Sequence, residues 1–221
     1  YDYLRINFDI IDPVNHIPHK RVLKDKSYIE AFLNEDQLIK YIKSSSSGPF
    51  RIIDLTQSNK NRWAAFNIEN IDGYHPAKLD SYNKFLNAKN IMNYNYNNLN
   101  LLNVKYVISD KILSDNYQKL EMNYFGQKYW IDGKKKTVYL HELNFSPRLF
   151  FVENILMYNS QNKDIYNLIT DSQFNPKKLS YINKENLHES KIKDIENIQY
   201  DDNALVKIIK WDPDKIIFST K

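Results

Sequence analysis

The chain has 221 residues and a formal net charge of +4, and 42% of its residues are hydrophobic. This length allows one large domain or two small ones, and the composition is that of a folded protein. Basic and acidic residues (31 and 27) interleave along the chain, which argues against a nucleic-acid partner. The absence of cysteine excludes disulfides, thiolate nucleophiles and cysteine-based zinc sites. No apolar run approaches the ~18 residues of a membrane-spanning helix.

The N-terminal part predicts a short strand, an irregular connection and a helix. Residues 3–8 alternate like a strand, and the prolines within residues 9–27 indicate a loop. His16 and His19 in this loop have no third ligand nearby, so we expect no metal site. Asn34 is the expected N-cap of the helix, which a serine-rich connector ends.

Two buried strands and an intervening turn form the centre of the predicted fold. The strands are expected at residues 50–55 and 103–109, where apolar residues dominate. Residues 73–82 lie between them and predict a tight turn that leads into a helix. Gly73 can take a positive φ, and Pro76 suits the first turn of a helix.

Distinctive polar side chains crowd this turn and allow two interpretations. The turn is either a helix start packed on a sheet or a ligand-contacting loop on a rigid scaffold. Asp72 and His75 could also act as an acid and a base, but no nucleophile elbow, P-loop or metal triad accompanies them. We therefore predict no catalytic residue, cofactor or metal. The candidate binding residues are Asp72, Gly73, Tyr74, His75, Lys78 and Arg148.

The second half of the chain indicates further strands. Residues 93–98 form a polar and aromatic linker whose tyrosines could stack on sugars or bases, although a place at a helix end is favoured. Residues 111–120 indicate a connection with some helix. Residues 128–140 predict a β-hairpin around an Asp-Gly turn. A strand is expected at residues 147–152, and a helix after Ser160.

The C-terminal segment is expected to be rich in β-structure. Residues 204–211 and 215–220 predict two strands joined by an Asp-Pro-Asp turn. We expect an α/β domain over residues 1–180 and a β-rich segment over residues 181–221, either truncated or packed on the first domain. The predicted fold class is α/β (α+β): a mixed sheet with helices packed on it, followed by a segment resembling the start of a β-sandwich. The hairpin argues against a purely parallel sheet.

Several stretches share their order and spacing with one protein family. They are residues 48–52 (GPFRI), 73–82 (GYHPAKLDSY), 101–108 (LLNVKYVI), 146–152 (SPRLFFV) and 206–217 (VKIIKWDPDKII). In this combination the chain resembles the YfhO family of bacterial membrane proteins over roughly residues 50–220. It departs from the family pattern in its first 45 residues and at Leu102, where methionine is common.

The resemblance implies an extracytoplasmic domain tethered to the bacterial membrane, whose partners are the protein's own transmembrane helices and a glycan or cell-envelope polymer. Members of this family resemble GT-C glycosyltransferases, which transfer sugar from a lipid-phosphate donor to a cell-envelope acceptor. Their essential acidic residue lies in a membrane-proximal loop, to which no part of this chain corresponds, so the chain alone is expected to be non-catalytic. The alternative is a free-standing carbohydrate- or polymer-binding module, which the abundance of tyrosine and tryptophan favours.

Overall fold

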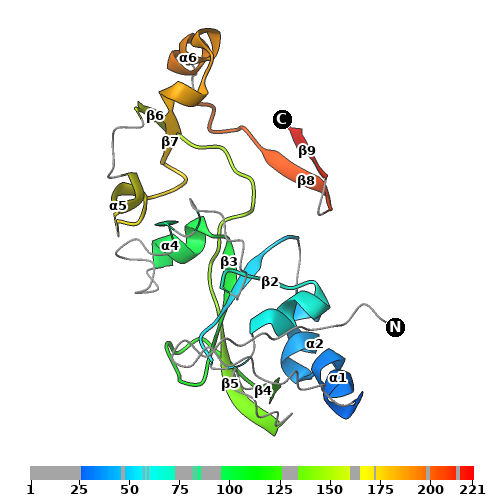
Figure 1. Ribbon diagram of the computed structural model, residues 1–221. Helices are drawn as coiled ribbons and strands as arrows, with labels where there is room; N and C mark the ends of the chain where they lie inside the picture. Colours follow the sequence, from blue (N-terminus) through cyan, green and yellow to red (C-terminus); the bar gives the residue numbers. More distant parts are fainter. Residues whose placement is uncertain are drawn as a thin grey trace, which may run out of the picture.

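The computed structural model describes most of the chain after residue 25. The described residues are 26–45, 48–56, 58, 60–72, 82, 84–85, 96–125, 134–159, 165–171, 173–197, 200–212 and 215–221. Helices pack on a mixed five-stranded sheet, and two further sheets have two strands each (Figure 1). The predicted α+β class is therefore confirmed. The expected strand at residues 3–8 and the loop with His16 and His19 lie outside the described residues.

The five-stranded sheet has the order β2-β1-β3-β5-β4. Its strands are β1 (Arg51–Asp54), β2 (Glu69–Asn70), β3 (Val104–Ser109), β4 (Gln118–Tyr124) and β5 (Lys134–Glu142). The β1 strand runs parallel to β2 and β3, whereas β5 runs antiparallel to β3 and β4. All six residues of β3 are buried, because β3 is central and both faces of the sheet are covered.

One face of the sheet is covered by α2 (Gln37–Ser44) and the 3₁₀ helix η1 (Lys60–Phe66), and α1 (Lys26–Leu33) packs against η1. The core on this face contains Leu38, Ile39, Ile42, Ile52, Trp63, Phe66, Ile68, Tyr106, Ile108, Leu120, Met122, Val138 and Leu140. The prediction of Asn34 as the helix N-cap is wrong. Asp36 has the extended backbone of an N-cap, and its Oδ1 accepts the Ile39 N–H at 2.9 Å.

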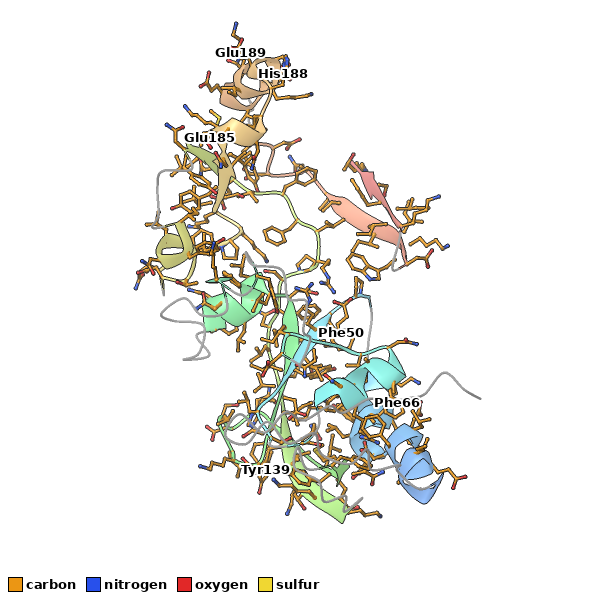
Figure 2. The ribbon with its side chains drawn as sticks, viewed as in Figure 1. Phe50, Phe66, Tyr139, Glu185, His188 and Glu189 are labelled. Carbon is orange, nitrogen blue, oxygen red and sulfur yellow. The ribbon has the colours of Figure 1, made fainter. Side chains whose placement is uncertain are left out.

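Arg62 is the largest fully buried side chain and connects these elements. Its Nη1 donates to Asp36 Oδ2 at 2.8 Å, and its other nitrogens donate to the carbonyls of Phe32 and Asn34. The guanidinium lies 5.1 Å from the ring centre of Phe66, which Figure 2 labels beside α2. Burial lowers the pKa of Arg62, while the charge and hydrogen bond of Asp36 oppose this shift.

The other face of the sheet is covered by α4 (Tyr96–Leu101) and α5 (Ile165–Ile169) (Figure 1). The buried residues on this face are Ile53, Ile71, Phe85, Leu99, Leu102, Val104 and Val107. Tyr82 is helical, as expected after the central turn, and its hydroxyl donates to the Ile71 carbonyl at 2.7 Å. The sheet thus has two separate cores, one on each face.

The β4 strand begins within residues 111–120, for which a connection with some helix was predicted, and continues over residues 121–124, for which no element was predicted. It pairs antiparallel with β5, and the last residue of β4, Tyr124, lies opposite the first residue of β5, Lys134. The first strand of the predicted hairpin, residues 128–131, lies outside the described residues. Gln37 Oε1 and Asp36 Oδ2 accept N–H groups along β4, at Glu121 and Asn123. These two side chains protect an edge strand that would otherwise expose its donors.

The strand predicted at residues 147–152 is absent, because these residues form no ladder. The strand lies further along, as β6 (Asn154–Tyr158), which pairs in parallel with β7 (Leu179–Asn183). Residues 146–148 are instead held by side-chain hydrogen bonds to other elements. The helix expected after Ser160 is present as α5.

The C-terminal strands are confirmed as β8 (Val206–Trp211) and β9 (Ile216–Thr220), which form an antiparallel hairpin. Between β7 and this hairpin lie η3 (Lys184–Asn186) and α6 (Glu189–Glu196), at the opposite end of the molecule from α1 (Figure 1). The expected domain division after residue 180 falls within β7, and the β-sandwich stays a prediction. No helix in the described part of the chain is long and apolar enough to span a membrane.

Candidate binding site

The structure describes two of the six predicted binding residues. The other four, Gly73, Tyr74, His75 and Lys78, lie outside the described residues. Asp72 is partly buried at the start of the predicted turn, and its N–H donates to Asn70 Oδ1 at 3.3 Å. Burial raises the pKa of Tyr82; the charge of Arg51 opposes this shift and that of Asp72 adds to it. The charges of Asp72 and Arg51 are therefore both close enough to act on the Tyr82 hydroxyl.

Arg148 connects the sheet to the C-terminal hairpin. Its Nη2 donates to Glu69 Oε2 at 2.7 Å, and Arg51 Nε donates to the same oxygen at 3.1 Å. On the side of β8, the guanidinium carbon of Arg148 lies 4.6 Å from the ring centre of Trp211. The side chain of Arg148 is only 10% exposed. The structure thus brings Arg148 together with Arg51 and Glu69.

A separate pocket lies between α4 and two loops, at residues 144–146 and 175–177. Its volume is about 240 Å³. The lining residues are Tyr96, Asn97, Asn100, Asn144, Phe145, Ser146, Asn175, Pro176 and Lys177. Four asparagines, a serine and two aromatic rings supply hydrogen-bonding groups beside flat apolar faces, which is a lining suited to a polyhydroxylated ligand.

Asn100 in α4 lines this pocket, and Asn103, just after α4, helps to hold the loop at residues 144–146. Asn103 has a φ of 59°, in the left-handed region that asparagine tolerates better than most residues, and so turns the chain from α4 into β3. Its Nδ2 donates to the Ser146 carbonyl at 2.7 Å, and the Ser146 N–H donates to Asn100 Oδ1. The Tyr96 hydroxyl donates to the Asn144 carbonyl. The loop at residues 144–146 is therefore held at both ends by α4 and its turn.

Lys105 lies behind the pocket wall. Its Nζ is 5.8 Å from the ring centre of Phe145 and donates to the Ser45 carbonyl at 3.0 Å, at the C-terminal end of α2. Burial acts to lower the pKa of Lys105, but hydrogen bonds and charge at Tyr106 and Glu142 outweigh burial and raise it. The charged ammonium thus supports an aromatic ring that lines the pocket.

Three buried oxygens around this wall have no hydrogen-bond partner among the described residues: Ser146 Oγ, Asn98 Oδ1 and Asn103 Oδ1. Unpaired buried polar atoms are uncommon in folded proteins. Ser146 is only 1% exposed and also lines the pocket, so its hydroxyl is a buried group available to a ligand. Lys177 adds an exposed positive charge to the lining.

A serine–histidine pair elsewhere does not have the geometry of a nucleophile and its base. His141 is 3% exposed, and its Nδ1 lies 3.0 Å from Ser114 Oγ. Its Nε2 accepts the Leu113 N–H at 3.4 Å, and the Ser114 hydroxyl donates to the Asn116 carbonyl, so in this arrangement the serine proton is not directed at the imidazole. A base must accept the serine proton. Among the described residues, no group of three or more histidine, aspartate or glutamate side chains is placed to hold a metal ion.

Sequence reasoning identified Tyr96 within a stretch whose tyrosines could bind sugars, but it missed Asn100, Ser146 and Lys177. The usable signal was the density of asparagine in and just after residues 93–98, which is unusual for a helix that only packs on a sheet. The lining from residues 175–177 has no local pattern that marks it. A scan against protein-family models and searches of curated proteins and of solved structures each found no match.

Proposed function

We propose that this chain is a non-catalytic extracytoplasmic domain of a membrane protein resembling the YfhO family, and that it holds one sugar unit of a cell-envelope glycan. The observation that carries the glycan proposal is the pocket lined by asparagine amides, the buried Ser146 hydroxyl and the rings of Tyr96 and Phe145. Amides and hydroxyls can both donate to and accept from sugar hydroxyls, while aromatic faces pack against the ring carbons.

The size of the pocket favours a single sugar unit. Its volume of about 240 Å³ lies below the roughly 300–1,000 Å³ of pockets that enclose drug-sized ligands. A longer glycan would therefore place one unit in the pocket and leave the rest outside. This arrangement suits a domain that presents a polymer to another part of the same protein.

The membrane context of the proposal rests on the resemblance. In that context the sugar transfer belongs to the rest of the protein, and this domain orients the acceptor. A free-standing carbohydrate-binding module would use the same pocket, so the complete gene distinguishes the two proposals. Several apolar helices flanking this chain would support the membrane-tethered domain, whereas a gene without them would favour the free-standing module.

Titration of the isotope-labelled chain with monosaccharides and envelope glycan fragments tests the pocket by NMR. We expect chemical-shift changes at residues 96–100, 144–146 and 175–177, and binding about tenfold weaker in Asn144→Ala and Lys177→Ala. Both side chains are exposed, so their removal leaves the fold intact. Asn116→Ala, an exposed asparagine in the 110–117 loop, is the matched control and should bind like the wild type. Equal affinity in all three variants would contradict the proposal.

A further inference from the structure

We propose that Arg51 and Arg148 form a binding site for a tetrahedral oxyanion of the phosphate class, and that the Glu69 carboxylate occupies this site in the ligand-free chain. This inference is independent of the glycan pocket. It rests on an imbalance in the ion-pair network that joins β1, β2 and the loop after β5. Two guanidinium groups converge on the same carboxylate oxygen, so more donors than acceptors meet there.

The hydrogen bonds show that one arginine donor in this cluster lacks an acceptor in the described part of the chain. Arg51 Nε and Arg148 Nη2 both donate to the same oxygen, Glu69 Oε2, at 3.1 and 2.7 Å. Arg148 Nε is buried and has no hydrogen-bond partner among the described residues. Nε and Nη2 lie on the same edge of a guanidinium, the edge that binds a two-oxygen anion in bidentate fashion. Glu69 therefore accepts a hydrogen bond from only one of the two donors on this edge, Nη2, and leaves Nε without an acceptor in the described structure.

A phosphate group matches the three donors better than a carboxylate does. A carboxylate has two oxygens in one plane, and here one of them is shared between two arginines. A phosphate monoester has three unesterified oxygens and inorganic phosphate has four, which is enough to give one each to Arg51 Nε, Arg148 Nη2 and Arg148 Nε. A phosphodiester retains two unesterified oxygens, enough for both donors on the edge of Arg148.

The surroundings hold the arginines in place while Glu69 is free to leave. The ring of Trp211 lies 4.6 Å from the Arg148 guanidinium and restricts its plane, and Arg51 Nη1 donates to the Leu102 carbonyl at 3.4 Å. The Glu69 side chain is 43% exposed, whereas that of Arg148 is 10% exposed. Glu69 can therefore rotate into solvent, and the buried guanidinium it leaves requires another anion.

NMR of the arginine Nε–Hε groups tests this site directly. The labelled full chain is titrated with inorganic phosphate at constant ionic strength, which removes general salt effects. We expect the Arg148 Nε–Hε signal to shift and saturate. The Nε–Hε signal of Arg62 should stay unchanged, because that nitrogen already donates to the Phe32 carbonyl at 3.0 Å. Acetate should bind more weakly than phosphate at the same site.

Three variants make the test decisive. Glu69→Ala removes the competing carboxylate, so phosphate should bind about tenfold tighter. Glu121→Ala makes the same change of net charge at another exposed ion pair and should bind like the wild type. Arg148→Lys keeps a positive charge but loses the bidentate edge, and should weaken binding at least about tenfold. If Glu69→Ala binds no tighter than Glu121→Ala, or if Arg148→Lys binds as the wild type does, the proposal is overturned.

A phosphodiester could belong to a soluble molecule or to a lipid headgroup. Soluble glycerophosphoglycerol, which is a phosphodiester, and vesicles of phosphatidylglycerol in phosphatidylcholine are therefore compared. Binding of glycerophosphoglycerol that Arg148→Lys weakens would assign the site to soluble phosphate groups. Arg148-dependent binding to the vesicles alone would assign it to headgroups. Binding that does not depend on Arg148 in either case would overturn the site.

Discussion

Replacing Asn103 tests how the pocket wall is held in place. The residue combines a left-handed backbone, with a φ of 59°, and a side-chain hydrogen bond of 2.7 Å to the buried Ser146 carbonyl. Asn103→Gly keeps the backbone conformation and removes only the amide, which should cost about 1–3 kcal/mol because a buried carbonyl loses its donor. Asn103→Ala also places a Cβ in the left-handed region. It should be about 1 kcal/mol less stable than Asn103→Gly, after the extra chain entropy of glycine is counted.

Asn67 provides the matched control, because its φ is 58° but its side chain is exposed. Asn67→Gly should change stability little, and Asn67→Ala should cost about 1 kcal/mol from the backbone alone. Urea denaturation followed by circular dichroism gives the free energy of unfolding of all four variants. The reasoning is refuted if Asn103→Gly is as stable as Asn67→Gly, or if alanine is no worse than glycine at both positions.

Two further predictions concern ionisable side chains in the interior of the fold. Arg62→Ala leaves the Asp36 carboxylate buried without its main partner and should cost about 3–5 kcal/mol, and the double variant with Asp36→Ala should cost less than the sum of the singles, as measured by urea denaturation. Lys105 and Tyr82 both have raised pKa values, so each is more strongly protonated in the folded chain than in the unfolded one. Their contribution to stability is full below about pH 10 and is lost at more alkaline pH. The melting temperature should fall less steeply above pH 10 in Lys105→Met than in the wild type, and an unchanged slope would contradict this.

The central strands were predictable because their signal is local. The β1 and β3 segments are apolar runs that are too short for a helix and are bounded by turn residues. The β8–β9 hairpin was predictable for a similar reason, since the sequence Asp-Pro-Asp, which is typical of turns, separates two apolar runs. Each of these segments is specified by residues within it.

The β4 strand was missed because much of what stabilises it comes from elsewhere in the chain. Its inward residues, Leu120 and Met122, are buried, but polar residues surround them and weaken the alternation. The N–H groups on its other edge are satisfied by Asp36 and Gln37, which lie more than 80 residues earlier. No window of sequence around β4 contains that information.

The pocket between α4 and its two loops could not be predicted for the same physical reason. Its lining comes from α4, the loop at residues 144–146 and the turn at residues 175–177. These segments meet because Asn103 and Asn100 bind the loop around Ser146. Sequence showed the asparagines, but only the fold shows which carbonyl and which N–H they face.

Several residues in the stretches on which the proposed resemblance rests connect one element of the fold to another. Arg51 and Arg148 share Glu69, Asn103 binds the Ser146 carbonyl, and Lys105 reaches the end of α2 at the Ser45 carbonyl. Residues that join elements constrain a scaffold whatever ligand the scaffold holds.

Of the residues that line the pocket, only Ser146 belongs to the stretches that resemble the family. A shared set of motifs would therefore argue for a shared scaffold, and it would leave the ligand of this chain open. The ligand has to be tested on side chains outside the motifs, such as Asn144 and Lys177, because substitutions within the motifs change the scaffold and the pocket together.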